Sequence, residues 1–546
     1  MSELRPSDFP PPWSDDEAFA KPSDSDPIEV DVAIVGAGPA GLAAAIRLGQ
    51  LGASEGRVVV LDKGRSPGAH LLSGAVVNPR SLETLLPGRL GEMPSYGRVE
   101  RESVYLLTRR RALRIPPPPT MRNEGNIVVS LSELGRWLAG EAEAGGAMLL
   151  PETDAQQLLV EGETVVGIRT GAKGQARDGS PTARFEPGAD VRARLTILAE
   201  GTQGHLTTAA LSQLGLASAQ PQVWALGVKE IWKVARPLDR VIHTMGWPLR
   251  SARRYREFGG SFIYPLGEGM VSIGLVVGLD YSDPHLSVHD LLQELKTHSR
   301  VRGILEGGER VQWGAKTIPE GGLVAVPQKL HAPGLLLCGD GAGLVNVAAL
   351  KGIHYAIESG RLAAEAAWRQ LTDGESLESY DASLRESFVW PDLREVRNMR
   401  QGFGRGFWVG SALAGVATLT KGKLPSGDAA TERDAEQPLR ANGAPAYPAP
   451  DGKLTFDKLS SVFLSGNRTR EDQPNHIKVQ THVPSELAEL WKNMCPAQVY
   501  EVGEATDGRV EVIVSSSNCV QCGAITAKGG RLTPPEGGSG PEYTLT

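Results

Sequence analysis

The chain has 546 residues, of which 40% are hydrophobic and 22% are charged, as is ordinary for a soluble globular protein of roughly two to four domains. A net charge of −7 without a long basic run argues against a nucleic-acid partner, and four cysteines are too few for a disulfide scaffold. No apolar run reaches the roughly 18 residues of a transmembrane helix. The acidic, Pro- and Ser-rich residues 1–27 lack the features of a signal peptide and predict a flexible lead-in to a cytoplasmic protein.

The first structured element is predicted over residues 30–62. An apolar, β-branched run leads into a glycine turn, an Ala- and Leu-rich helical pattern follows, and a second strand ends on Asp62. In such a βαβ unit Gly36 makes the tight turn, and Gly38 lets the backbone approach a pyrophosphate at the helix N-terminus. Gly41 lets the helix pack closely on the strand, and Asp62 can accept hydrogen bonds from ribose hydroxyls. The unit predicts a dinucleotide site without choosing between NAD and FAD.

Later segments predict a helix, a strand that ends at a second glycine turn, a pair of antiparallel strands, and a buried strand followed by a glycine turn and a long helix: residues 129–149, 189–206, 259–281 and 332–371. The carboxylate of Asp340, in the last glycine turn, suits the ribityl and pyrophosphate groups of an extended FAD. The turn at Gly201 is another strand–glycine turn of the same kind. With the βαβ unit and the turn at Asp340 it makes three such elements, and three in this order favour FAD. Cys338, on the apolar strand before Asp340, is interpreted as a small buried core residue.

Three of the four cysteines lie in the tail after Leu454. Cys519 and Cys522 have the Cys-x-x-Cys spacing that begins many iron–sulfur loops. Where the next cysteine of such a loop would stand, the chain has Ile525. The tail therefore predicts a metal site, a redox pair or the remnant of a lost site.

Several segments are together highly specific: "GAHLLSGAVVNP", "HTMGWPL", "GGSFIYPL", "KGIHYAIESGRLAAEA", "TFDKLSSVFLSGNRTREDQPNHI", "CPAQVYEV" and "PPEGGSGPEY". In them the chain, from about Val30 onward, resembles the electron transfer flavoprotein–ubiquinone oxidoreductase family. The resemblance implies an FAD domain, a quinone-binding region that touches the membrane, and a C-terminal domain with a four-iron four-sulfur cluster. Electrons would arrive from reduced electron transfer flavoprotein and leave on ubiquinone.

The implied fold is α/β, with an FAD-binding Rossmann-like domain of the glutathione-reductase type, an antiparallel-sheet quinone-binding region and a C-terminal ferredoxin-like α+β domain. The expected boundaries are the lead-in at 1–27, the FAD domain at 28–220 and 325–400, the quinone-binding region at 221–324, a membrane-contacting helix at 400–425, a linker at 430–452 and the ferredoxin-like domain at 453–546.

The resemblance also implies which residues contact each ligand. The FAD contacts would be Gly36, Gly38, Gly41, Asp62, His70, Ser73, Gly74, Gly201, Asp340 and Asn346. Asn346 would present its amide near the isoalloxazine, the alternative being a turn or helix cap. The quinone contacts would be Gly259 and Gly260, which leave room for a quinone carbonyl to reach backbone N–H groups, the alternative being a bulge or bend.

For the cluster, the resemblance implies Cys495, Cys519 and Cys522 as ligands, while Ile525 at the fourth position cannot ligate iron. Three outcomes stay open: a cubane held by three cysteines, with one iron left for water or a non-cysteine ligand, a three-iron cluster, or a lost cluster. Zinc is disfavoured because a closed site needs four N or S ligands and no nearby His completes it. A dithiol pair lacks a thioredoxin-like βαβ context.

An enzyme that reduces ubiquinone must reach lipid, because the isoprenoid tail keeps the quinone in the bilayer. The apolar segment 406–419 is too short to span the hydrocarbon, so we expect monotopic attachment through it, with an ordinary buried helix as the alternative. Aromatic residues suited to the interface and basic residues that can meet anionic headgroups surround it: Phe403, Phe407, Trp408, Arg400, Arg405, Lys421 and Lys423. The basic run at 109–119 is a weaker candidate for the same surface.

The implied activity is that of an FAD-dependent oxidoreductase, an electron-transferring-flavoprotein dehydrogenase that reduces ubiquinone or menaquinone at the cytoplasmic side of the inner membrane. Two alternatives remain at this point. One is an FAD-dependent reductase of an apolar, isoprenoid-type substrate, which the C-terminal ferredoxin-like tail disfavours. The other is a non-quinone electron-relay subunit of a flavoprotein complex.

Overall fold

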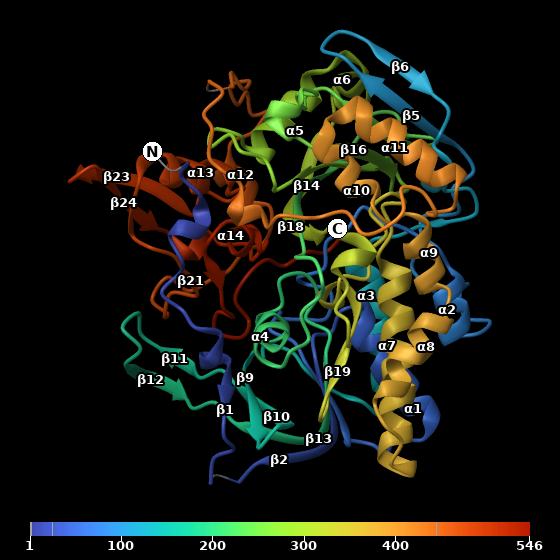
Figure 1. Cartoon of the computed structure of the whole chain (residues 1–546), viewed down its shortest axis with the longest axis vertical. Helices are drawn as coiled ribbons and strands as arrows, with labels where there is room; N and C mark the ends of the chain where they lie inside the picture. Colours follow the sequence, from blue (N-terminus) through green and yellow to red (C-terminus); the bar gives the residue numbers. More distant parts are fainter. Residues whose placement is uncertain (1–2, 25, 444) are drawn as a thin grey trace.

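The computed structural model describes residues 3–24, 26–443 and 445–546. Figure 1 shows a dinucleotide domain at the bottom, a central, mostly antiparallel sheet above it, and a C-terminal domain at the left, beside the central sheet. The α/β fold class predicted from the sequence is confirmed, with the strands arranged in two large sheets and several short ones.

The dinucleotide domain is built on a nine-stranded sheet with the order β1-β9-β10-β13-β2-β3-β8, to which β20 and β19 are added beside β13. Its strands are β1 (Phe19–Ala20), β2 (Ile28–Val35), β3 (Val58–Leu61), β8 (Met148–Leu150), β9 (Ala155–Glu161), β10 (Thr164–Thr170), β13 (Asp190–Leu198), β19 (His331–Ala332) and β20 (Leu335–Leu337). The strands β8, β3, β2, β13 and β20 run parallel to one another. Their β-branched and Leu-rich sequences are typical of parallel strands that are covered on both faces.

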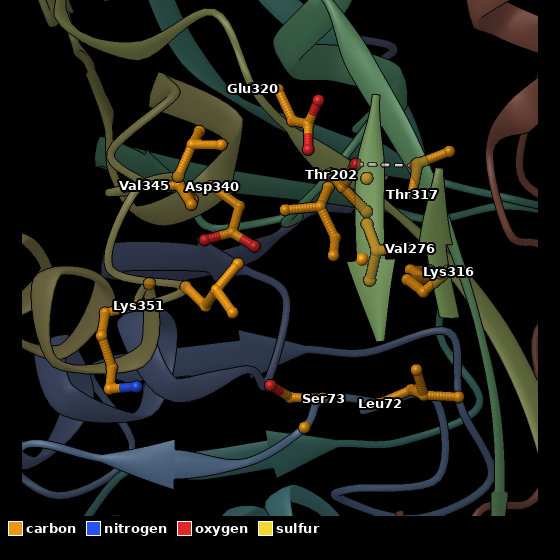
Figure 2. Close-up of a pocket in the computed structure, with 18 of the residues that line it drawn as sticks. Leu72, Ser73, Thr202, Val276, Lys316, Thr317, Glu320, Asp340, Val345 and Lys351 are labelled. Atoms are coloured by element: carbon orange, nitrogen blue, oxygen red, sulfur yellow. Dashed lines mark hydrogen bonds between the residues drawn. The ribbon is translucent and has the colours of Figure 1, made fainter. Parts of the chain in front are cut away.

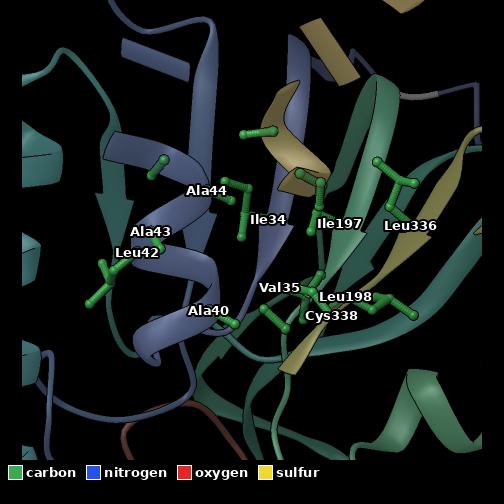
Figure 3. Close-up of a cluster of buried hydrophobic side chains, with 14 of the residues drawn as sticks. Ile34, Val35, Ala40, Leu42, Ala43, Ala44, Ile197, Leu198, Leu336 and Cys338 are labelled. Carbon is green, nitrogen blue, oxygen red and sulfur yellow. Dashed lines mark hydrogen bonds between the residues drawn. The ribbon is translucent and has the colours of Figure 1, made fainter. Parts of the chain in front are cut away.

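Helices pack closely on this sheet and bury most of its apolar surface. They are α1 (Pro39–Leu51), α2 (Arg80–Leu85), α3 (Leu131–Ala144), α4 (His205–Gln213), α7 (Ile353–Asp373), α8 (Glu378–Glu386) and α9 (Val389–Glu395). Figure 3 shows the centre of this core, where Ile34, Ala44 and Ile197 meet between β2, α1 and β13. Cys338 is fully buried in the same core, and its thiol donates to the Leu198 carbonyl oxygen at 3.6 Å.

The central sheet has seven strands in the order β18-β14-β17-β16-β15-β5-β6. They are β5 (Glu102–Leu107), β6 (Ala112–Ile115), β14 (Trp224–Lys233), β15 (Val241–Gly246), β16 (Gly259–Pro265), β17 (Met270–Gly278) and β18 (Glu309–Pro319), and helices α5 (Val288–Thr297) and α6 (Ser299–Leu305) pack on them. The expected quinone-binding region, 221–324, contains five of these strands. The other two, β5 and β6, lie within residues 28–220, which were expected to belong to the FAD domain. They join the central sheet because β5 pairs in parallel with β15.

The C-terminal domain contains a three-stranded antiparallel sheet, β22-β24-β23, and a two-stranded one, β21-β25. Its elements are α12 (Lys458–Phe463), β21 (Ile477–Lys478), β22 (His482–Val483), α13 (Ser485–Met494), β23 (Tyr500–Thr506), β24 (Arg509–Val514), α14 (Ala524–Ala527) and β25 (Arg531–Leu532). Its apolar side chains share one core with the central sheet, including Trp313 and Trp491. Before it come α10 (Met399–Gly402) and α11 (Phe407–Leu419), which lie at the upper right in Figure 1.

The remaining short strands form small sheets, and the lead-in 1–27 differs from expectation. Two small two-stranded antiparallel sheets contain the remaining strands: β4 (Val76–Val77) with β7 (Ile127–Val128), and β11 (Lys173–Gln175) with β12 (Pro181–Glu186). The lead-in 1–27, expected to be flexible, instead packs on the body where it is described. There β1 pairs in parallel with β9, and Ala18 is fully buried. The reason is that Phe19 and Ala20 complete the free edge of β9, which the sequence alone does not reveal.

Candidate flavin site and cysteine cavity

One cavity of about 970 Å³ extends from the turn between β2 and α1 to helix α11. This volume lies at the upper end of the range usual for cofactor and ligand sites. Ten of the twelve residues predicted for FAD and quinone line it: Gly36, Gly38, Asp62, His70, Ser73, Gly74, Gly201, Asp340, Gly259 and Gly260. Gly41 and Asn346 do not.

The glycine turn has the geometry that its sequence predicts. Gly36 has a φ of +106°, and a Cβ there would stand 2.4 Å from the Ala199 carbonyl oxygen. Both the backbone conformation and the lack of space therefore exclude a side chain at this position. A Cβ on Gly41 would stand 2.0 Å from the Gly36 carbonyl oxygen, which explains its place in the packing of α1 rather than in the cavity wall. Gly38 is open by contrast, because the first atom that its Cβ would meet is Leu71 Cδ2 at 3.7 Å. The open position is the one that a pyrophosphate would approach.

Asp62 links the glycine turn after β2 to the loop after β3. Its carboxylate accepts one hydrogen bond from the Ala37 backbone N–H at 2.8 Å and another from the Gly64 backbone N–H at 2.7 Å. Two backbone donors hold the side chain in one orientation at the end of β3. A carboxylate has further acceptor sites, so Asp62 can still receive a ribose hydroxyl.

Four lysines line the cavity, and the sequence analysis missed them: Lys229 and Lys351, which are buried, and Lys63 and Lys316, which are half-buried. Burial lowers the pKa of Lys229 to about 7 and the pKa values of Lys316 and Lys351 to about 8. Uncompensated buried ammonium groups are costly, so the cavity favours an anionic occupant such as a diphosphate. A usable signal was present for Lys229, which stands in the mostly apolar strand β14.

The predicted acidic and amide residues behave differently. Asp340 lines the cavity, and burial raises its pKa to about 6 (Figure 2). The Asn346 side chain is turned away: its Oδ1 accepts from the Ala349 N–H at 2.9 Å, and its amide faces the Tyr355 hydroxyl at 3.4 Å. Asn346 is therefore a turn cap in this structure, and it is Lys351, paired with it across the turn, that reaches the cavity.

Unpartnered polar atoms provide an independent test of whether FAD fits. His70 Nδ1 and Gln203 Nε2 belong to residues that line the cavity, and each is buried without a hydrogen-bond partner among the described residues. Buried polar groups are normally satisfied, so these atoms indicate a polar ligand. With the open glycine turn, Asp62 and the lysines, the residues fit a bound FAD.

The far end of the cavity is lined by the central sheet. The ladder between β15 and β16 ends at the pair Thr244–Ser261, so Gly259 and Gly260 are paired with β17 but not with β15. Met245 and Gly246 line the cavity at the splayed ends of the two strands. A Cβ on Gly259 would stand 2.0 Å from the Val276 carbonyl oxygen, so its glycine is also required by the strand pairing.

Arg400 differs from expectation. It was expected to meet lipid headgroups, but it is buried and donates to Asp280 and to Glu320, at 2.7 Å each. Two carboxylates from the central sheet region capture it because an unpaired guanidinium could not be buried there. Arg405, Lys421 and Lys423 are exposed, as predicted.

A second, smaller cavity lies in the C-terminal domain and is lined by Cys495, Cys519 and Cys522 together with Ile525. The Val499 N–H points at Cys495 Sγ at 3.4 Å, and the Gln521 N–H points at Cys519 Sγ at 3.3 Å. Burial raises the pKa of all three thiols, and a bound metal would favour the thiolates by supplying compensating positive charge.

The arrangement of the cysteines bears on whether the site would hold an iron–sulfur cluster or a single metal ion. Among the described residues, no three His, Cys, Asp or Glu side chains converge on one metal-ion position. In an iron–sulfur cluster each thiolate binds a different iron, so the sulfurs surround a volume rather than a point. Three cysteines around one cavity suit this arrangement better than a closed zinc site, which needs four N or S ligands.

The two cavities are joined through β18. The Thr202 and Thr317 hydroxyls lie 2.8 Å apart (Figure 2), and Thr317 donates from both its N–H and its hydroxyl to the Cys522 carbonyl oxygen, at 2.8 and 2.9 Å. Gly523 lines both cavities, and Lys316 Nζ donates to the Gln521 carbonyl oxygen at 3.1 Å. A continuous bonded and hydrogen-bonded connection therefore links the large cavity to Cys522, one of the three predicted cluster ligands.

Comparisons with known proteins agree with this architecture. Three family models match: "FAD binding domain" over residues 29–257, "ETF-QO, ubiquinone-binding" over 224–318, and "Electron transfer flavoprotein-ubiquinone oxidoreductase, 4Fe-4S" over 452–544. Among solved structures, a geranylgeranyl bacteriochlorophyll reductase-like protein from Thermoplasma acidophilum has a TM-score of 0.56 at 19% identity, covering 72% of this chain and 92% of that one. This likeness shows the fold of the FAD-binding part.

Full-length relatives are much closer in sequence. The electron transfer flavoprotein-ubiquinone oxidoreductase of Pseudomonas aeruginosa is 40% identical, with 94% of this chain and 98% of the relative covered. The mitochondrial proteins of the same name from Oryza sativa and Rattus norvegicus are 38% and 39% identical, over 94% of this chain and 92% and 89% of their own lengths. An FAD cavity joined to an iron–sulfur domain, and relatives matched over nearly their whole length, place this chain in the electron transfer flavoprotein–ubiquinone oxidoreductase family.

Proposed function

We propose that this protein carries electrons from reduced electron transfer flavoprotein to ubiquinone in the membrane, by way of an iron–sulfur cluster and FAD. The observation that carries the proposal is the single cavity that connects the glycine turn to helix α11 and is joined through Thr317 to Cys522. Donor and acceptor can then meet the protein at separate surfaces. The family membership disfavours a reductase of an isoprenoid substrate and a relay subunit without quinone chemistry.

The chain's own residues bind and orient the groups, and FAD supplies two-electron redox chemistry when it is bound. Gly36, Gly38 and Asp62 would hold the pyrophosphate and ribose. The buried ammonium of Lys229, which donates to the Ser73 carbonyl oxygen at 2.7 Å, stiffens the segment Ser73–Gly74 beside the cavity. At the other end of the cavity, the apolar mouth would exclude water and admit a quinone ring toward Gly259 and Gly260.

Helix α11 would be the membrane contact. It exposes large apolar side chains, with Trp408 68% and Leu419 87% exposed, and Phe407, Ser411 and Ala414 line the cavity from the same helix. Among the described residues no helix is long and apolar enough to cross a bilayer. A short helix with an exposed apolar surface and flanking basic residues suits monotopic attachment.

The hairpin β5–β6 adds to this surface. Ile115 and Pro118 line the same cavity as α11, Leu113 is 62% exposed, and Arg109 to Arg111 are exposed at the hairpin turn. Figure 1 shows the hairpin and α11 at the same end of the molecule. We propose that both rest on the cytoplasmic face of the inner membrane, where a soluble flavoprotein donor can reach the C-terminal domain.

The test is quinone reduction by the protein in liposomes that contain ubiquinone, with reduced electron transfer flavoprotein as donor. In the variant Ala414→Trp a large side chain would fill the cavity mouth, so quinone reduction should fall at least tenfold while the donor still reduces the flavin. Ala412→Trp is the matched control, because Ala412 is exposed on the same helix and does not line the cavity. Absence of turnover with any quinone would refute the proposed function.

A further inference from the structure

The fourth corner of the cysteine cavity is apolar. Cys495 follows α13, while Cys519 and Cys522 lie in the loop before α14, and the three face one cavity. Ile525 stands three residues after Cys522, in the first turn of α14, and its side chain forms the next part of the wall. The position at which a fourth thiolate would complete the set is thus filled by a hydrocarbon side chain.

Ile525 is fixed in this place by its packing. Its Cγ1 lies so close to Gly530 that a Cβ on that glycine would stand 2.6 Å away, and the Gly530 N–H donates to the Ile525 carbonyl oxygen at 3.0 Å. Ala524 and Val520, its neighbours in the wall, are almost fully buried. The side chain cannot swing aside to admit a substitute ligand without opening this core.

No other cysteine of the described chain is available in the cavity to replace the missing thiolate. Among the described residues that line the cavity, the remaining side-chain heteroatoms are the Met494 thioether and the Tyr500 hydroxyl. Met494 directly precedes Cys495 in the chain, and Tyr500 begins β23, so neither comes from α14, which carries Ile525. Neither provides an anionic sulfur, which cluster iron normally takes.

Water is also a poor ligand at this corner. A buried water needs roughly two to four polar partners, whereas Ala524, Ile525 and Leu532 offer only hydrocarbon side chains to the cavity. A polar ligand there would be desolvated without compensation. A cubane iron at this corner would therefore have neither a thiolate nor a well-held water as its outer ligand.

We propose that this domain holds a three-iron four-sulfur cluster, one iron on each of Cys495, Cys519 and Cys522, with Ile525 occupying the corner that a fourth iron and its ligand would need. An oxidised three-iron cluster on three thiolates carries the same net charge as an oxidised cubane on four, so the surrounding protein meets the same buried charge. The inference goes beyond the proposed function, since it concerns the composition of the cluster and not its electron donor or acceptor.

The test compares wild-type protein with Ile525→Cys and Ile525→Val, all purified anaerobically, by iron and sulfide analysis and electron paramagnetic resonance. Wild type and Ile525→Val should contain three irons for every four inorganic sulfides and show a signal when oxidised. Ile525→Cys should gain the fourth iron on incubation with Fe²⁺ and reductant, lose the oxidised signal and show a signal only when reduced. Wild type under the same incubation should keep three irons.

Two results would overturn the inference: four irons per four sulfides in the wild type without an oxidised signal, or no iron at all. The wild-type measurement decides the matter even if Ile525→Cys does not fold. If a cubane is found, Met494→Leu and Tyr500→Phe will identify the ligand. Because metal content and spectra are measured without turnover, a failed quinone assay leaves this test intact.

Discussion

Helices α1 and α11 are alike in length and composition but opposite in burial. Each has 13 residues, and both are rich in Ala, Gly and Leu. In α1 most side chains are buried, whereas of the thirteen described residues of α11 only Gly410 and Ala417 are buried. Composition therefore predicts that each segment is an apolar helix, but it does not predict what covers that helix.

The neighbours explain the difference. Helix α1 packs between the parallel sheet and helices α3 and α7, and Gly360 of α7 is so close that a Cβ there would stand 2.0 Å from the Ala40 carbonyl oxygen. Helix α11 contacts α10 and the mouth of the cavity and leaves its remaining surface exposed. One helix is stabilised by protein on every side, and we propose that lipid completes the surroundings of the other.

The largest expected effect comes from overfilling the close packing of α1. In Gly41→Val the new Cβ would overlap the Gly36 carbonyl oxygen, so we expect a loss of stability of about 3 kcal/mol or more and protein without flavin. Thermal unfolding and flavin absorbance measure both. Gly38→Ala is the control, because its Cβ meets no atom closer than 3.7 Å, and it should unfold like wild type. Equal stability of the two variants would contradict this account of α1.

Removing the ion pairs beside α11 should have the next largest effect. In Arg400→Met the carboxylates of Asp280 and Glu320 lose their buried partner, so unfolding should become easier by about 3 kcal/mol. Hydrogen exchange should locate the loss in residues 399–419 and not in α1. Arg405→Met, at an exposed arginine of the same segment, should change little. Equal losses in both variants would mean that the ion pairs do not anchor α11.

The same ion pairs predict a pH dependence. Burial opposes the ionisation of Asp280, but Arg400 outweighs it and the pKa of Asp280 lies below its ordinary value of 3.8. A depressed carboxyl pKa stabilises the fold above the unfolded value, so this contribution is lost as the pH falls below about 4. For Glu320 burial prevails over Arg400 and raises the pKa, so Glu320 takes up its proton first on acidification. Wild type should lose more stability than Arg400→Met between pH 5 and 3, roughly, in denaturant titrations.

Membrane binding should respond to the exposed face of α11. The double variant Trp408→Glu and Leu419→Glu should weaken binding to anionic liposomes by about tenfold to a hundredfold, because charges replace side chains that would enter the apolar boundary. Flavin content and melting temperature should stay unchanged. Phe463→Glu, at an 83% exposed side chain on α12, is the matched control and should bind like wild type. Unchanged sedimentation of the double variant would refute the proposed contact.

The smallest effect is expected from a single flanking charge. Lys423→Gln should weaken binding to anionic liposomes by about fivefold, leave binding to neutral liposomes unchanged, and lose its effect at high salt. The measurement is a binding titration at two salt concentrations. An equal effect on neutral liposomes would mean that Lys423 acts through structure and not through charge.

Much of the site could be predicted because it depends on local backbone geometry. The roles of Gly36, Gly41 and Asp62 follow from a strand, a tight turn and a helix that lie within one short stretch of sequence. The sequence analysis expected the Asn346 amide to point toward the isoalloxazine. In this structure the amide instead faces Tyr355 on the next helix. Lys229 and Lys316 were missed because a strand pattern does not show which face of the strand points into a cavity.

The sequence by itself determined the βαβ unit with its glycine turn and the family, and it predicted three cysteine ligands with a gap at Ile525, since each depends on residue identity at short spacing. Only the tertiary structure decided that Arg400 is buried, that residues 102–115 join the central sheet and that α11 stays exposed. These are contacts between segments far apart in the chain. Neither the periodicity nor the composition of one segment shows which other segment it contacts. The apolar surroundings of Ile525 belong to the same class, because α13, β25 and the cysteine loop meet only in the folded protein.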